Sequence, residues 1–370
     1  MPTLVIHVGA QKCGSTTVQN AFANFVSSDY KSWLKFKIFP PELALRMHRD
    51  FSAVASREVD VQLAEICEED NCLILSCESL CNYPDVVAKL ANCALNLVPN
   101  VKIIVIGYIR AQFSYYLSEY KQWLFRAKAR LREDINFFHR NDLLPNKFLP
   151  HERRMFVNAI KSFEECRQRD WYDYYKCVEE LISDSDANVL VKSSHIPTKQ
   201  LNYSLIEDFL EKVSLEGFDM RVFAATPRSV NASFNPLFCE SIALHICNNT
   251  LDSSHFPGPH EGNELISEAS SQFNLCQEDV LGGIGGAISL CQAMKSTVAA
   301  NFAESNEKYC CMYNIDRQYF EVEDPSAVCS SREELFVVAR QIQDSRDYNE
   351  IHDCERQLLR ELSLVEFIFK

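Results

Sequence analysis

The sequence lacks a long apolar run, a cationic leader and any Cys-x-x-Cys pair. A membrane span needs about 20 consecutive apolar residues, so none is predicted. Because residues 1–9 already have the pattern of a strand, we expect no signal peptide and a cytoplasmic protein. The 16 cysteines are scattered, which argues against a zinc or redox site and favours buried thiols over a disulfide framework.

An excess of positive charge is also missing. The chain has 370 residues and a formal net charge of -14 at pH 7. This charge disfavours nucleic acid or an anionic membrane as the main partner, although a basic cleft is compatible with an acidic surface. With 47% hydrophobic residues, the chain is long enough and apolar enough to bury a large core.

The most informative stretch lies at the start of the chain. An apolar run over residues 3–8 ends at Gly9, and Lys12, Gly14 and the hydroxyl residues 15–17 precede a helical pattern. The two glycines allow a tight turn and a close approach of the backbone to an anion. The free N–H groups of the helix start, the hydroxyls and the Lys12 ammonium would all face that anion. The pattern therefore predicts a phosphate-binding loop between a central strand and a helix.

The order of residues in this loop separates two classes of phosphate-binding protein. A nucleoside triphosphatase loop has its Lys directly after the second Gly, whereas Lys12 comes two residues before Gly14. The order Lys-x-Gly-[Ser/Thr]-Thr instead resembles the 5′-phosphosulfate loop of the sulfotransferases, which use 3′-phosphoadenosine 5′-phosphosulfate (PAPS). The resemblance implies that this co-substrate is held by the loop residues Gln11, Lys12, Cys13, Gly14, Ser15, Thr16 and Thr17.

A second buried strand is predicted at residues 72–75, and Glu78 follows it. Open α/β sheets bind ligands at the carboxyl ends of their strands, so a carboxylate there is placed to take a proton from an acceptor hydroxyl. Cytosolic sulfotransferases carry their catalytic His at the corresponding strand end, and the ending Ser76-x-Glu78 looks like that of bacterial relatives. A helix N-cap or a surface carboxylate is the alternative. His48 is a second, less favoured base, and is otherwise a surface or helix-packing histidine.

The strongest predicted strand, residues 101–110, ends in Arg110 and leads into a helical pattern that contains Ser118. A guanidinium at a strand end can bind a phosphate through two hydrogen bonds, and the alternative is a simple ion pair at the helix start. In sulfotransferases an Arg at this strand end and a Ser eight residues later bind the 3′-phosphate of PAPS, and Arg110 and Ser118 have that spacing. With two motifs in the right order, the chain resembles the bacterial-type, PAPS-dependent sulfotransferases of the P-loop superfamily.

This resemblance implies an α/β protein, a three-layer P-loop fold with a central parallel sheet flanked by helices, plus a mainly helical C-terminal extension. We expect a sulfotransferase-like P-loop domain at 1–250, a connecting segment at 251–285 and a helical region at 286–370 packed on the same domain. Residues 29–70 are expected to cover the ligand cleft. A further short strand is predicted at residues 188–192.

The sequence thus predicts a transferase that moves the sulfuryl group of PAPS in line to a hydroxyl or amine of an acceptor. Glu78, or less favourably His48, would take the acceptor proton, and Lys12 would neutralise charge on the departing phosphate, with no metal required. Carbohydrate is the family's commoner acceptor class, with lipid or small alcohol as alternatives. The rival functions are a P-loop kinase-like phosphotransferase, which would need a strand-end Asp for Mg²⁺, and a non-catalytic nucleotide-binding relative. No oligomeric state is indicated.

Overall fold

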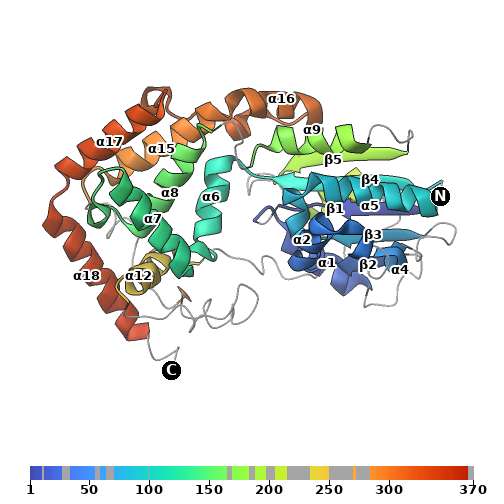
Figure 1. Ribbon diagram of the computed structural model, residues 1–370, viewed down its shortest axis with the longest axis horizontal. Helices are drawn as coiled ribbons and strands as arrows, with labels where there is room; N and C mark the ends of the chain where they lie inside the picture. Colours follow the sequence, from blue (N-terminus) through green and yellow to red (C-terminus); the bar gives the residue numbers. More distant parts are fainter. Residues whose placement is uncertain are drawn as a thin grey trace. The chain divides into compact units, whose positions relative to one another are not determined.

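A computed structural model of the chain divides into two units. The structure describes residues 1–10, 12–26, 34–54, 59–63, 71–98, 100–164, 169–182, 188–196, 205–214, 234–249, 270–271 and 284–365. Unit 1 comprises Met1–Arg110, Arg169–Asn231 and Glu304–Tyr319 (Figure 1). Unit 2 comprises Ala111–Gln168, Ala232–Ala303 and Phe320–Lys370. Each unit is therefore assembled from separate stretches of chain. The boundaries expected from the sequence, at residues 250 and 285, stay a prediction.

Five parallel strands form the sheet of unit 1, in the order β2-β3-β1-β4-β5 (Figure 1). Strand β1 is central, with Thr3 aligned to Cys72 of β3 on one side and to Lys102 of β4 on the other. Apolar runs are buried on both faces of these three strands, as is typical of parallel sheets. The predicted α/β class with a parallel sheet is confirmed. The strands are β1 (Thr3–His7), β2 (Leu34–Ile38), β3 (Cys72–Ser76), β4 (Lys102–Ile109) and β5 (Val189–His195).

Strand β2 is the element that the sequence analysis missed. It lies within residues 29–70, which we expected to form a cover, and it pairs in parallel with β3 at the edge of the sheet. Its sequence alternates strictly between apolar Leu34, Phe36 and Ile38 and basic Lys35 and Lys37. Alternation of this kind is typical of an edge strand with one polar face, so the signal was present.

Helices cover both faces of the sheet (Figure 1). Neighbouring residues on a strand point to opposite faces of the sheet. The neighbours of Gly107 and Tyr108 in β4 therefore show which helix packs on each face. A Cβ at Gly107 would overlap Oη of Tyr175 on α9, whereas Oη of Tyr108 donates a 2.7 Å hydrogen bond to Asp208 on α10. Helix α5 packs against α9, and α1 packs against α10. The helices of unit 1 are α1 (Ser15–Val26), α2 (Pro41–Arg49), α3 (Phe51–Val54), α4 (Asp60–Leu63), η3 (Glu78–Asn82), α5 (Pro84–Leu97), α9 (Trp171–Ile182), α10 (Leu205–Val213), α16 (Ala303–Tyr313) and η7 (Arg317–Phe320).

In the described residues, unit 2 is helical, and its core is rich in phenylalanine. Phe138 contacts Phe148 and Phe156 edge-to-face, with ring centroids 5.1 and 5.4 Å apart. Such pairs add to the burial energy of the rings. The helices are α6 (Gln112–Tyr120), η4 (Leu124–Arg126), α7 (Lys128–Arg140), η5 (Pro145–Lys147), α8 (Pro150–Lys161), α12 (Pro236–Cys247), α15 (Ala287–Asn301), η8 (Pro325–Ala327), α17 (Arg332–Ser345) and α18 (Tyr348–Val365).

A buried ion pair joins the C-terminal helices of unit 2 to α8. Arg346, directly after α17, donates two hydrogen bonds to the carboxylate of Glu152, at 2.6 and 2.8 Å. The same guanidinium donates to the carbonyls of Lys147 and Gly285, so its N–H groups are well satisfied. Glu152 also accepts from the N–H of Leu149 at the start of α8. A bidentate pair of this kind fixes the angle between the elements that it joins.

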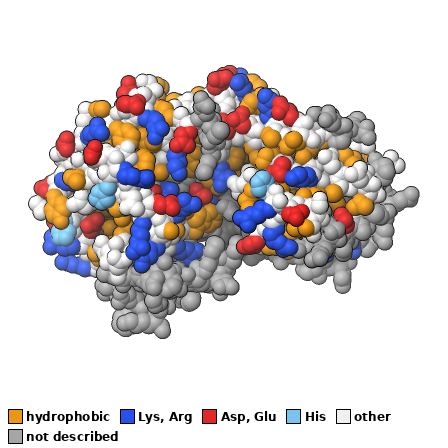
Figure 2. Space-filling model, viewed as in Figure 1, with side chains coloured by type: hydrophobic (Ala, Val, Ile, Leu, Met, Phe, Trp, Pro, Cys, Tyr) orange, Lys and Arg blue, Asp and Glu red, His pale blue; other side chains and the backbone are white. Residues whose placement is uncertain are grey.

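The surface carries mixed charge. On the visible face of unit 2, Figure 2 shows basic and acidic side chains interspersed with hydrophobic ones. The cysteines of the described residues are free thiols and most are buried, as expected from the sequence. In the part of the chain that the structure describes, no helix combines the length and the apolar character needed to cross a membrane.

Candidate functional site

The loop after β1 has an unusual backbone conformation. Lys12 and Gly14 both lie in the left-handed region, with φ of 66° and 81°, and the N–H of Cys13 donates to the carbonyl of Ala10. A lysine rarely adopts this conformation, and such strain is found mostly at functional sites. Helix α1 begins immediately afterwards at Ser15, so its first-turn N–H groups have no intrahelical acceptor and face the loop.

Both glycines of the loop are required by close packing. A Cβ at Gly14 would overlap the side chain of Leu205 at the start of α10. A Cβ at Gly9 would lie 2.7 Å from Cβ of Ser15 and 3.0 Å from Nε2 of His7. The loop is therefore folded tightly against the end of its own strand, as anion-binding loops are.

Glu78 lies beside the loop. It opens η3 directly after β3, and its Oε1 accepts hydrogen bonds from the hydroxyls of Ser15 at 2.7 Å and Thr16 at 3.2 Å. The structure thus brings together three residues that the sequence analysis selected from two distant motifs. They meet because β1 and β3 are parallel neighbours whose carboxyl ends share one edge of the sheet.

Positively charged side chains act on the same loop. Burial and, to a lesser extent, the nearby charge of Arg110 lower the pKa of Lys12 to about 8, although the carboxylate of Glu78 acts in the opposite direction. Arg110 follows β4, and its carbonyl accepts a 2.9 Å hydrogen bond from Nε1 of Trp171. Among the described residues, no carboxylate pairs with the Arg110 guanidinium. The loop therefore combines positive charge with the first-turn N–H groups of α1.

A buried polar network lies at the carboxyl ends of β1 and β3, next to the loop. The sequence analysis did not find this network. Nδ1 of His7 lies 2.9 Å from Oγ of Ser76, which also accepts a 3.0 Å hydrogen bond from Nε2 of Gln19. Complete burial lowers the pKa of His7 to about 4, so the ring is neutral at physiological pH. The signal was a histidine inside an otherwise apolar strand, opposite a serine in the neighbouring strand.

The remaining predicted residues have different surroundings. His48 lies on α2, where its Nδ1 is 3.0 Å from Oδ1 of Asp85 and its ring contacts Tyr83. Burial raises the pKa of Cys13 to about 12, so its thiol is protonated. Thr17 is exposed on the first turn of α1. Ser118 is a buried residue of α6 and belongs to unit 2, while Gln11 lies outside the described residues.

The end of β5 adds a histidine near the loop. The ring of His195 stacks on Tyr319, with centroids 4.1 Å apart, and its Nδ1 donates to the carbonyl of Ile196. Burial lowers the pKa of His195 to about 4, and the charge of Arg110 contributes to this shift. A neutral imidazole at this strand end adds no positive charge to the site.

A cavity of about 520 Å³ lies elsewhere in unit 1, between β5 and α10. Its polar lining includes Lys192, Asp208 and Lys212, which already contact protein groups. None of the cavity's lining residues belongs to the loop, so the cavity and the loop are separate features of unit 1. Within the described ranges, no group of three or more His, Cys, Asp or Glu side chains is arranged to hold a metal ion.

No family model, curated protein or solved structure matches this chain. The resemblance to sulfotransferases therefore depends on the two sequence motifs alone and stays a prediction. The structure places the first motif at the carboxyl end of the central strand, where the strand order reverses between β3 and β4. It also places Arg110 of the second motif within electrostatic reach of Lys12.

Proposed function

We propose that unit 1 binds PAPS through the loop between β1 and α1 and transfers its sulfuryl group to an acceptor hydroxyl. The observation that carries the proposal is the convergence of Lys12, Arg110 and the open N–H groups of α1 on one tightly folded loop. A doubly charged phosphosulfate matches such a set of donors, because charge-assisted hydrogen bonds to phosphate oxygens are strong. Lys12 would stay close to the bridging oxygen, where negative charge grows as the sulfuryl group departs.

Glu78 is the proposed general base. In the ligand-free loop its carboxylate accepts from Ser15 and Thr16, and an incoming phosphosulfate would offer those hydroxyls a competing acceptor. Transfer of the two hydrogen bonds to the ligand would free Oε1 of Glu78 to take the acceptor proton. The loop would thereby couple co-substrate binding to activation of the base. Carbohydrate is the proposed acceptor class, with lipid or small alcohol as alternatives, and the resemblance to the family is its basis.

The two phosphates of the nucleotide have separate proposed ligands. Lys12 and the loop would hold the 5′ group, and Arg110, which follows β4 in unit 1, would hold the 3′-phosphate. This assignment predicts a preference for 3′-phosphoadenosine 5′-phosphate over AMP. The preference would depend on Arg110, whereas Lys12 would affect both nucleotides.

The test is calorimetric titration with 3′-phosphoadenosine 5′-phosphate, AMP and Mg-ATP. We expect the bisphosphate to bind tightest, and Lys12→Ala to weaken it about tenfold or more, the value of a charge-assisted hydrogen bond. Lys89→Ala is the matched control, because Lys89 is an exposed lysine paired with Asp85 and should have no effect. Preference for Mg-ATP would support the kinase-like alternative, and binding without transfer to any acceptor would support a non-catalytic relative.

A further inference from the structure

Among the described residues of unit 2, one buried arginine has no partner for its terminal N–H groups. Arg126, at the end of η4, is only 7% exposed, and neither Nη1 nor Nη2 has a hydrogen-bond partner among the described residues. Its guanidinium lies 5.8 Å from the centre of the Phe125 ring, a cation–π contact that leaves the N–H groups unbonded. A buried, unpaired guanidinium is costly and is normally satisfied by an acceptor.

The other buried arginines of unit 2 show how this chain usually treats such groups. Arg154 pairs with Asp134 at 2.9 Å, and Arg346 pairs with Glu152. Arg153 donates to the carbonyls of Pro145 and Phe148. In the described part of unit 2, Arg126 is therefore the exception. Its Nη1 and Nη2 groups lack the acceptors that the other three buried arginines have.

A second cation lies nearby. Lys121 directly follows α6, and burial lowers its pKa. Among the described residues its ammonium has no carboxylate within ion-pair distance. Both Lys121 and Arg126 act electrostatically on the thiol of Cys239, which donates to the carbonyl of Lys121 at 3.5 Å. Burial raises the pKa of Cys239 far above its usual range, so this thiol is neutral and does not balance the two charges.

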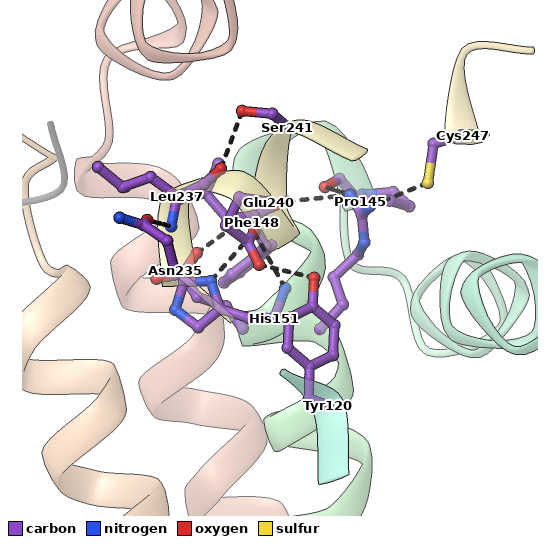
Figure 3. Close-up of polar contacts among 12 residues, drawn as sticks. Tyr120, Pro145, Phe148, His151, Asn235, Leu237, Glu240, Ser241 and Cys247 are labelled. Atoms are coloured by element: carbon purple, nitrogen blue, oxygen red, sulfur yellow. Dashed lines mark hydrogen bonds and ion pairs between the residues drawn. The ribbon is translucent and has the colours of Figure 1, made fainter. Parts of the chain in front are cut away.

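Glu240, a carboxylate that acts electrostatically on Lys121, already has other partners. Figure 3 shows Tyr120 and His151 converging on Glu240 of α12. Oη of Tyr120 donates to Oε1 at 2.6 Å, the backbone N–H of His151 donates to Oε2 at 3.3 Å, and Nδ1 of His151 lies 3.2 Å from Oε2. The charge of Glu240 raises the pKa of His151 against the effect of burial. Glu240 is therefore the anion partner of His151.

We propose that Arg126 and Lys121 bind an oxyanion, a carboxylate, sulfate or phosphate group, within unit 2. The planar fork of Arg126 offers two parallel N–H donors to such a group, and Lys121 offers a second charge. The anion would replace the missing acceptor of Arg126 and compensate the charge of both side chains. This site is argued from unit 2 alone and does not depend on the proposed nucleotide site. Its ligand is a free small anion or the charged group of an acidic saccharide.

The experiment uses the tryptophan that lies beside the site. Trp123 accepts a 3.2 Å hydrogen bond from the N–H of Arg126 through its carbonyl, while Trp171 contacts Arg110. The chain has 3 tryptophans, so 5-fluorotryptophan labelling gives 3 fluorine resonances, assigned by Trp→Phe variants. Sodium sulfate, sodium phosphate, acetate and glucuronate are titrated at constant ionic strength. Tighter binding of glucuronate than of acetate identifies a saccharide, and equal binding identifies a free anion.

We expect a saturable shift of the Trp123 resonance with at least one of these anions, and at least a tenfold weaker response in Arg126→Met. Lys12→Ala should leave the Trp123 response intact, so failure at the nucleotide loop is distinguishable from failure here. In anion-free buffer Arg126→Met should unfold at the same or a higher temperature than the parent, because it removes an unpaired buried charge. Lys121→Met should also weaken the anion response of the Trp123 resonance. It replaces Arg126→Met as the test variant if Arg126→Met does not fold.

Arg154→Met is the matched control, since Arg154 is equally buried but paired with Asp134. It should lower the unfolding temperature and keep the anion response. The proposal is overturned if no anion moves the Trp123 resonance, or if Arg126→Met responds like the parent. A large loss of thermal stability in anion-free Arg126→Met would also overturn it, because the guanidinium would then have a protein partner.

Discussion

Binding of 3′-phosphoadenosine 5′-phosphate should weaken as the pH rises from 7 to 9, because Lys12 loses its proton in this range. Burial and the neighbouring Arg110 lower the pKa of Lys12 to about 8, whereas an exposed lysine titrates above pH 10. The protonated ammonium is the form that attracts the phosphates. Their second ionisation has a pKa of about 6, so the ligand keeps its charge throughout this range.

The magnitude follows from the fraction of protein with a charged Lys12. With a pKa of about 8, roughly nine-tenths of the molecules are protonated at pH 7 and roughly one-tenth at pH 9. If the bound phosphate keeps Lys12 protonated, the Kd at pH 9 is about tenfold higher than at pH 7. A lysine with an ordinary pKa would leave the Kd almost unchanged over the same interval.

Calorimetric titration at several pH values, in buffers of different ionisation enthalpy, measures both the Kd and the proton uptake. Uptake should be close to zero at pH 7 and should rise toward one proton per ligand at pH 9. Lys12→Gln should bind more weakly at pH 7 and show no pH dependence. A parent protein whose affinity is flat between pH 7 and 9 would refute the assignment of Lys12 to the phosphate site.

Further variants test the neighbouring residues. Glu78→Gln should lower the transfer rate about 100-fold or more, the contribution of a general base, while bisphosphate affinity is retained or increased; an unchanged rate in an acceptor assay would exclude Glu78 as the base. Gly14→Ala should abolish bisphosphate binding and cost about 1–3 kcal/mol of stability, because φ is 81° and Leu205 blocks a Cβ. Glu152→Gln should cost about 3–5 kcal/mol in urea unfolding, since it leaves the Arg346 charge buried and unpaired, and Glu152→Gln with Arg346→Met should restore part of this loss. Full stability of the single variant would contradict that reasoning.

Local sequence pattern was sufficient for most elements of unit 1. The runs that become β1, β3 and β4 are apolar on both faces, so their strand character and burial follow from composition alone. The short strand expected at residues 188–192 is confirmed as the start of β5, and terminal helices are confirmed as α17 and α18. Strand β2 was overlooked because its basic residues suggested a surface cover, although their alternation indicated an edge strand.

The site was predictable where residues lie at strand ends. Lys12, Ser15, Thr16 and Glu78 could be grouped in advance because parallel strands place their carboxyl ends at one edge. The His7, Ser76 and Gln19 network could not be grouped in this way, since it depends on the register between β1 and β3 and on the direction of a helical side chain. His48, kept as a second base, is hydrogen-bonded to Asp85, a pairing that no local pattern indicates.

The sequence by itself determined which segments form strands and helices, the order of residues in the loop and the presence of enough apolar residues for a large core. These properties depend on composition and on neighbours along the chain. Only the tertiary structure decided which charges meet and which remain unpaired. Lys12 acquires its lowered pKa from burial and from Arg110, which is 98 residues away in the chain. Among the described residues, the fold brings a carboxylate to the guanidinium of Arg154 and no hydrogen-bond partner to Nη1 and Nη2 of Arg126. The free energy of a buried charge is set by the groups around it in space, and the sequence positions of those groups do not reveal their distances.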